Sequence, residues 1–467
     1  MRGKAICHKL LILMLTIFCV SAAGPGSARA AGEQSFSSWL GKLWPEAKTA
    51  GVSRATFDRV FSSLTPDCKL PGVYCPGETR KSSGRKLSER TGLPETCNKI
   101  TQPEFLQPEK YFPPKYMRSL ALKGRSILAD LEAQGPKTHE HLMEIERSFR
   151  VPVNMLMGLW GRETAFGAAK LNHNGFRALA SHAYAGYKSR QGWSRKQLIA
   201  ALVMVEQGHM TPEQFRSSYA GATGLTQIMP DEFLGFAVDG DRDGKLDLWR
   251  SVPDALATTA NVLKDRGWHS GAKSWGYEIR LPEPSANFDC TLENRANRWP
   301  IGHWTQKYGI KRVPRLGRQQ PEFPNLGNIG YLVLPAGARG PAFLVTENFD
   351  VLRSYNPADL YALFVGHLAD RVGCDTDSRE CIFHTPWPKS TADDFEFSVE
   401  NLCRMQIALK KGGFLEGTPD GLFGVQTRVA IGRYQKATKR RPDCYPSQSL
   451  FKELMSGAGP QTVNRPG

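Results

Sequence analysis

The sequence lacks several patterns that would assign the chain to a class at once. It has no C-x-x-C pair and no cysteine–histidine cluster with zinc-site spacing, which argues against a metal–thiolate centre. It has no internal repeat, so a repeat architecture is not expected. Its apolar run from Leu10 to Val20 is shorter than the ~20 residues that a membrane-spanning helix needs. The 467 residues are therefore expected to form globular domains, about two or three of them.

Acidic residues are outnumbered by basic ones. The sequence holds 45 Asp and Glu against 61 Lys and Arg, a formal net charge of +16. This balance suits nucleic acid, an anionic membrane surface or an acidic polymer such as a cell wall as a partner. A merely soluble basic surface would carry the same charge, so the charge does not choose among these partners.

The first thirty residues indicate export. Three basic residues and no acid precede the apolar run Leu10–Val20, and small residues stand at Ala28 and Ala30, where a signal peptidase cleaves. A lipoprotein anchor at Cys19 is the alternative, but it needs a small residue before the cysteine, and Phe18 is large. We therefore expect a signal peptide over 1–30.

Cysteines are the next feature of the mature chain. Eight of the ten follow the signal segment, and an even number in an exported protein predicts disulfides. Proximity in the sequence favours Cys374–Cys381 first and Cys403–Cys444 second.

Hydrophobic periodicity divides the chain into helical and irregular parts. Apolar residues have helical spacing over 36–64 and 111–266, and a segment rich in Cys, Pro and Gly, 65–101, separates the two as a surface insertion. Beyond residue 282, Gly, Pro and Trp are frequent, and β-like pieces occur at Tyr331–Leu334 and Phe343–Thr346.

The C-terminal part contains a helix, a linker and a small domain. A helix is expected over 357–372, whereas 386–397 has prolines and no helical or strand period. We therefore expect 31–385 to fold alone, with 386–397 as a linker to a helical domain over 398–457.

A carboxyl group lies on an otherwise apolar helical face. Leu156, Trp160 and Glu163 recur at intervals of three and four residues, after Pro152 at the helix start and before Gly167 as its expected end. Apolar neighbours disfavour the charged form of a carboxyl group, and a general acid must be protonated to act. Glu163 is thus a candidate acid/base residue, with an ordinary surface glutamate as the alternative.

Small residues crowd the segment Ser218–Pro230 (SYAGATGLTQIMP). Such residues let a ligand approach the backbone closely, and Ser218 and Gln227 can hydrogen-bond the hydroxyl or amide groups of a ligand. A tightly packed turn between helices is the alternative for this segment alone.

The segments containing Glu163 and Ser218 resemble the membrane-bound lytic murein transglycosylase B family. The matching motifs, in order, are Gly161–Gly167 (GRETAFG), Ser218–Pro230, Ala237–Asp239 continuing to Trp249, Gly267–Trp268, Gly340–Leu344 (GPAFL), Asn348–Phe349 and Tyr355–Pro357. The resemblance covers about residues 36–372, apart from the insertion. It implies an α+β, mostly α fold: a lysozyme-like helical catalytic core with a small β-containing segment.

The resemblance also implies an enzyme of peptidoglycan that needs no catalytic cofactor. Glu163 would be its only catalytic carboxylate, and the product would be a 1,6-anhydro-muramoyl end. One carboxylate suffices because the nucleophile is the substrate's own C6 hydroxyl. The matching substrate-binding residues are Ser218, Gly221, Gln227, Tyr355 and Asn356.

Two other functions stay open. A muramidase would hydrolyse the same bond with Asp231 or Glu232 positioning water. A non-catalytic wall-binding scaffold could keep the same fold, although the retained Glu163 argues against it.

An Asp-rich loop fits the first half of a calcium-binding pattern. Asp239, Asp241 and Asp243 follow D-x-D-x-D-G, the backbone carbonyl of Lys245 stands at the seventh position, and Arg250 replaces the acid of the twelfth. The family resemblance points to Asp254 as the completing acid and so to a structural Ca²⁺. An Asp-rich turn without metal is the alternative.

A second resemblance concerns the C-terminal domain. Ser398 can cap a helix, and Asp420–Thr427 (DGLFGVQT) precedes another, as in the three-helix peptidoglycan-binding module. Two cell-wall signatures on one exported chain favour peptidoglycan over nucleic acid as the partner, in the periplasm, where proteins of wall synthesis or remodelling are further candidate partners.

Overall fold

The structure of the chain is a computed structural model that describes residues 35–77, 86–98, 107–133, 136–272, 274–285, 288–313, 321–374 and 383–457. The expected signal segment, 1–30, and Cys381 lie outside these ranges. In the described part, no helix is long and apolar enough to cross a bilayer. Helices predominate over one small sheet and a two-stranded ladder, which confirms the α+β, mostly α expectation.

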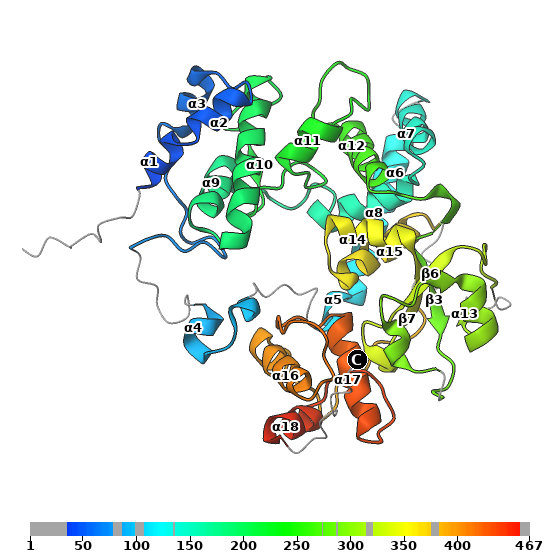
Figure 1. Cartoon of the computed structure of the whole chain (residues 1–467). Helices are drawn as coiled ribbons and strands as arrows, with labels where there is room; N and C mark the ends of the chain where they lie inside the picture. Colours follow the sequence, from blue (N-terminus) through cyan, green and yellow to red (C-terminus); the bar gives the residue numbers. More distant parts are fainter. Residues whose placement is uncertain are drawn as a thin grey trace, which may run out of the picture.

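One group of helices packs around an apolar core that includes Leu43, Phe57 and Leu202. The helices α1 and α3 begin where Ser35 and Ser53 accept hydrogen bonds from backbone N–H groups of the first turn. The predicted helical stretch 36–64 is thus divided into three helices, which lie beside α10 in Figure 1. The group consists of α1 (Phe36–Gly41), α2 (Trp44–Thr49), α3 (Arg54–Phe61), α9 (Gly175–Ala185), α10 (Lys188–Glu206) and α11 (Pro230–Phe236).

A second group of helices surrounds α8. Its members are α5 (Pro108–Tyr111), α6 (Pro114–Ala133), α7 (Pro136–Phe149), α8 (Val153–Thr164), α12 (Val252–Asp265), α14 (Glu347–Tyr355) and α15 (Asp359–Val372). Glycine lets α15 approach α8 closely, because a Cβ atom at Gly158 would lie 2.6 Å from the Val365 carbonyl oxygen. At Gly161 it would lie 2.6 Å from Leu368. The helix α15 therefore packs tightly against α8, the helix that carries Glu163.

The sheet is antiparallel, with strand order β4-β6-β7-β3-β5. Its central pair, β6 and β7, has Leu332 opposite Leu344 and confirms both predicted β-like pieces. Trp304 of α13 (Ile301–Tyr308) is buried in the core on one side of the sheet. The strands are β3 (Gly276–Arg280), β4 (Trp299–Pro300), β5 (Lys311–Arg312), β6 (Ile329–Val333) and β7 (Ala342–Thr346), and a separate ladder joins β1 (His173–Asn174) to β2 (Arg216–Ser217).

The C-terminal module, residues 398–457, contains α16 (Val399–Lys411), α17 (Val425–Ala437) and α18 (Gln448–Ser456). Ser398 caps α16 as expected, because its side chain accepts a hydrogen bond from the Asn401 N–H. In Figure 1 the module lies beside the sheet, and α17 packs against the short turn η5 (Cys290–Glu293).

The disulfides differ from the expectation. Cys68 pairs with Cys75 inside the insertion, but Cys97 pairs with Cys403, and Cys290 pairs with Cys444. The predicted Cys403–Cys444 bond is therefore wrong, because both cysteines face partners outside the module. Cys374 is also disulfide-bonded, and its expected partner Cys381 lies outside the described residues.

The segment before the module is irregular but packed. Residues 386–397 form no helix or strand, yet the Trp387 ring stacks on Phe112 with centroids 5.1 Å apart. On the module side, the Ala338 N–H donates to the Asp443 carbonyl at 2.8 Å. The segment before the module is thus stacked on the catalytic region, and the module itself is held by two disulfides and a backbone hydrogen bond.

Candidate active site

Glu163 lies in the last turn of α8. Leu156 and Trp160 are buried on the same helical face, and Glu163 itself is half-buried. The structure therefore has the carboxyl group where the predicted spacing put it, at the edge of an apolar stripe.

The helix ends at Thr164, earlier than the expected end at Gly167. Ala165 (φ 49°) and Phe166 (φ 58°) already have left-handed backbone conformations, so the helix cannot continue. Such a conformation costs about 1–3 kcal/mol for a residue with a side chain and is common at functional sites. The Thr164 hydroxyl contributes to the turn by accepting a hydrogen bond from the Gly167 N–H at 3.1 Å.

The segment Ser218–Pro230 forms a compact loop. Gly221 has φ 100° and packs so closely that a Cβ atom would lie 2.3 Å from Leu179. Gln227 is left-handed at φ 58°, and its Nε2 donates to the Gly224 carbonyl at 3.0 Å. The small residues are therefore needed for the path of the loop itself.

Two hydrogen bonds hold this loop beside Glu163. The Thr164 hydroxyl donates to the Leu225 carbonyl at 2.6 Å, and the Tyr355 hydroxyl donates to the Thr226 carbonyl at 2.6 Å. The loop is thus joined both to the end of α8 and to the end of α14.

The pKa values of two tyrosines are influenced by the Glu163 carboxylate. The Tyr361 hydroxyl donates a hydrogen bond to Glu163 Oε1. Burial, and then the negative charge of Glu163, raise the pKa of Tyr361 well above its ordinary value. The same two causes, in the same order, raise the pKa of Tyr355. Both phenols therefore stay protonated: Tyr361 donates to Glu163, and Tyr355 donates to the Thr226 carbonyl.

Sequence reasoning missed two neighbours of Glu163. Tyr361 is spaced at three and seven residues from Phe364 and Leu368, so its position is typical of an apolar core residue. Arg162 follows no motif by itself, but its guanidinium lies 5.7 Å from the Tyr361 ring centroid and 5.2 Å from that of Tyr111. The Tyr355–Pro357 motif, which ends four residues before Tyr361, was the feature of the sequence that could have drawn attention to it.

The other predicted site residues lie in the connecting turns. The Ser218 hydroxyl oxygen accepts hydrogen bonds from the N–H groups of Ala220 at 3.3 Å and Ala222 at 3.2 Å. Asn356 Oδ1 accepts from the Ala358 N–H at 3.1 Å, between α14 and α15. Ser218, Gly221 and Gln227 share one loop, and Asn356 adjoins Tyr355.

Asp231 and Glu232, the acids that a muramidase could use to position water, both pair with basic side chains of this chain. Asp231 pairs with Lys196 at 2.8 Å. Glu232 pairs with Arg266 and also accepts the Met229 N–H at 3.2 Å. Both carboxylates thus brace α11.

The Asp-rich loop brings together three of its predicted ligands. Carboxylate oxygens of Asp239, Asp241 and Asp254 lie within 4.8 Å of one another. Asp243 is not part of this cluster; its N–H donates to Asp239 Oδ1 at 3.1 Å instead. Asp254 is buried, and burial raises the pKa of its carboxyl group.

Comparison with known proteins places these features in a family. The Transglycosylase SLT domain model matches residues 35–370, and the Putative peptidoglycan binding domain model matches residues 398–454. Membrane-bound lytic murein transglycosylase B of Escherichia coli (strain K12) is 29% identical over 229 residues, which are 48% of this chain and 58% of that enzyme. The chain thus aligns with little more than half the length of this relative.

Solved structures agree over most of the chain. SltB3 from Pseudomonas aeruginosa in complex with NAG-anhNAM-pentapeptide is 32% identical, with 91% of this chain and all of that chain covered, at a TM-score of 0.71. The same protein in complex with NAG-NAM-pentapeptide is 33% identical over 90% of this chain and all of that one, at 0.72. The chain belongs to the SLT transglycosylase family.

Proposed function

We propose that the chain is a lytic transglycosylase that cleaves the MurNAc–GlcNAc bond of peptidoglycan and leaves 1,6-anhydro-MurNAc ends. The observation that most supports this proposal is the half-buried Glu163 at the end of α8, which accepts a hydrogen bond from the Tyr361 hydroxyl. Relatives support the substrate and the reaction, since one is named a lytic murein transglycosylase and another is solved with NAG-anhNAM-pentapeptide.

Glu163 performs both proton transfers in this mechanism. As an acid it protonates the glycosidic oxygen while the bond to C1 breaks. As a carboxylate it then accepts the proton of the C6 hydroxyl, whose oxygen attacks C1 and closes the anhydro ring. The nucleophile belongs to the same sugar, so its effective concentration is high and no second carboxylate is needed. Tyr361 holds the carboxyl group in orientation through its hydrogen bond.

The loop and turn around Glu163 bind the sugars in this proposal. Gln227 Oε1 has no protein partner within the described part of the chain, so it can accept a hydrogen bond from a hydroxyl or acetamido group. Gly221 lets the loop that carries Gln227 pack directly against Leu179. Ser218, Tyr355 and Asn356 fix the geometry of the surrounding turns.

The C-terminal module binds the same polymer and the enzyme works in the periplasm. The match to a peptidoglycan-binding domain over 398–454 and the expected signal over 1–30 support this placement. Proteins of wall synthesis or remodelling remain candidate partners.

The product tests the proposal directly. Mass spectrometry of muropeptides released from sacculi by the pure protein should find saccharide ends one water lighter than the hydrolysis product, because the C6 oxygen replaces water as nucleophile. Predominantly reducing ends would make the protein a muramidase. No release by the folded protein would favour a non-catalytic scaffold.

We also propose a structural Ca²⁺ at Asp239, Asp241 and Asp254, with Asp243 and the carbonyl of Lys245 as further ligands from the same loop. Three convergent carboxylates are the donors that Ca²⁺ prefers. Asp254 forms no ion pair within the described residues although it is buried, so a bound cation would compensate its charge. This site serves stability, and catalysis needs no cofactor.

Calcium should therefore raise the melting temperature of the full chain through binding linkage, by an amount that grows with concentration. Asp241→Asn should abolish the rise, because Asp241 contributes one of the three clustered carboxylates. Asp265→Asn, at an exposed acid ending α12, is the matched control and should keep it. A melting temperature indifferent to calcium would favour an Asp-rich turn without metal.

A further inference from the structure

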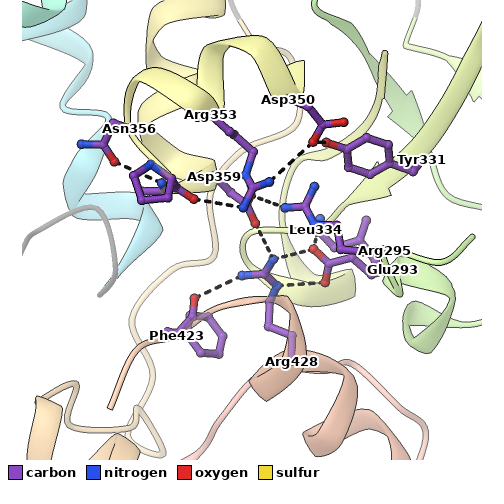
Figure 2. A network of polar contacts seen from close by, with 12 residues as sticks. Glu293, Arg295, Tyr331, Leu334, Asp350, Arg353, Asn356, Asp359, Phe423 and Arg428 are labelled. Atoms are coloured by element: carbon purple, nitrogen blue, oxygen red, sulfur yellow. Dashed lines mark hydrogen bonds and ion pairs between the residues drawn. The ribbon is translucent and has the colours of Figure 1, made fainter. Parts of the chain in front are cut away.

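A buried arginine of the C-terminal module reaches into the catalytic region. Arg428 lies on α17 and is 2% exposed. Its Nε donates to Glu293 Oε2 at 2.8 Å, and its Nη2 contacts Glu293 Oε1 at 2.5 Å and Asp359 Oδ2 at 3.2 Å (Figure 2). Its Nη1 donates to the Phe423 carbonyl at 3.2 Å, which fixes the guanidinium to its own module. One side chain thus joins the module to two acids of the preceding region.

Asp359 is the more informative of these two acids. It is the first residue of α15, and three arginines surround it: Arg428, Arg295 and Arg353. Burial alone would raise its pKa, but the arginines outweigh burial and hold the pKa of Asp359 below its usual value. The carboxylate is therefore ionised and anchors the start of the helix, where a negative charge also stabilises the helix dipole.

The segment that joins α14 to α15 is flanked by Tyr355 and by Tyr361, the tyrosine that donates to Glu163. Tyr355 ends α14 and Tyr361 lies two residues after Asp359, in the first turn of α15. Arg353, which contacts Asp359 at 2.9 Å, also donates to the Pro357 carbonyl at 3.1 Å and so braces the turn between the two helices. Figure 2 shows Asn356, Arg353 and Asp359 in this turn, with Arg428 approaching from the module side. A shift of Asp359 would therefore be transmitted to Tyr361 within one helical turn.

We propose that Arg428 is a positioning residue of the active site: by holding Asp359 it sets the start of α15, and thereby the Tyr361 hydroxyl against Glu163. The C-terminal module then completes the catalytic geometry as well as binding the wall. This inference rests on the proposed function, because it assigns Glu163 the acid/base role. Displacement of a catalytic contact by about 1 Å can cost up to about 10²-fold in rate.

The test uses the full, oxidised chain and a short soluble glycan, a tetrasaccharide of alternating GlcNAc and MurNAc, so that wall attachment plays no part. Arg428→Met should lower kcat by roughly 10-fold with little change in KM, because Tyr361 is displaced but the sugar cleft is not. Arg428→Lys should restore part of kcat, since it returns a cation to Asp359. Arg433→Met is the matched control, because Arg433 lies on the same helix but pairs with the exposed Glu416.

A loss of stability must be separated from a loss of positioning. Arg428→Met leaves Glu293 buried without its cation, so the double variant Glu293→Gln/Arg428→Met removes that unpaired charge. The double variant should recover the melting temperature while kcat stays low, because the contact with Asp359 is still missing. Recovery of kcat together with stability would overturn the inference, as would unchanged kcat in the folded single variant or an effect confined to KM. Absence of anhydro product from the wild-type chain would instead contradict the proposed function.

Discussion

Glu163→Gln should lower kcat on peptidoglycan by at least ~10²-fold and leave the fold intact. Glutamine has the shape of glutamate, and its Oε1 can still accept the hydrogen bond from Tyr361. It can neither give a proton to the glycosidic oxygen nor take one from the C6 hydroxyl. The measurement is release of muropeptides from sacculi, together with circular dichroism and a thermal melt to confirm folding.

Asp231→Asn is the matched control for this variant. Asp231 lies at the start of α11 and pairs with an exposed lysine, Lys196, so its loss should change activity little. A muramidase that uses Asp231 to position water would instead lose activity comparably in both variants. A folded and fully active Glu163→Gln protein would end the assignment of Glu163.

The sequence was most informative where local patterns fix local structure. Helical spacing placed Glu163 on the edge of an apolar face, and the β-like pieces became β6 and β7. The end of α8 was missed because Ala165 and Phe166 turn left-handed, which no propensity favours for residues with side chains. There Phe166 packs against Gly124, and Thr164 hydrogen-bonds Leu225, contacts that come from distant parts of the chain.

Local sequence patterns could not predict contacts between residues that are far apart in the sequence. Cys97 and Cys403 are separated by 306 residues, so proximity could not suggest their bond. Tyr361 occupies a core-like position on α15, and only the packing of α15 against α8 turns its hydroxyl toward Glu163. Both misses concern contacts between the C-terminal half of the chain and its N-terminal half: Cys403 with Cys97, and Tyr361 with Glu163.

We expected residues 31–385 to fold alone, but two disulfides and a buried ion pair to the C-terminal module predict a different result, which is the second large effect. A chain ending at Thr385 loses Cys403, Cys444 and Arg428, which are the partners of Cys97, Cys290 and Glu293. Loss of a native disulfide typically costs ~2–5 kcal/mol, and a buried carboxylate left without its partner costs ~3–5 kcal/mol. Total stabilities of about 5–15 kcal/mol leave little margin for three such losses.

The truncated chain should therefore melt at least ~10 °C below the full chain and lose most of its turnover on soluble glycan fragments as well as on sacculi. A full-length chain cut by a protease at a site engineered beside the exposed Lys389 is the control. Its module stays attached through the two disulfides, so it should keep its activity until a reductant is added. If instead the truncated chain melts like the full one and turns over soluble fragments at the full rate, the module is a separable tether, because neither its disulfides nor Arg428 would then be needed to hold Tyr361 against Glu163.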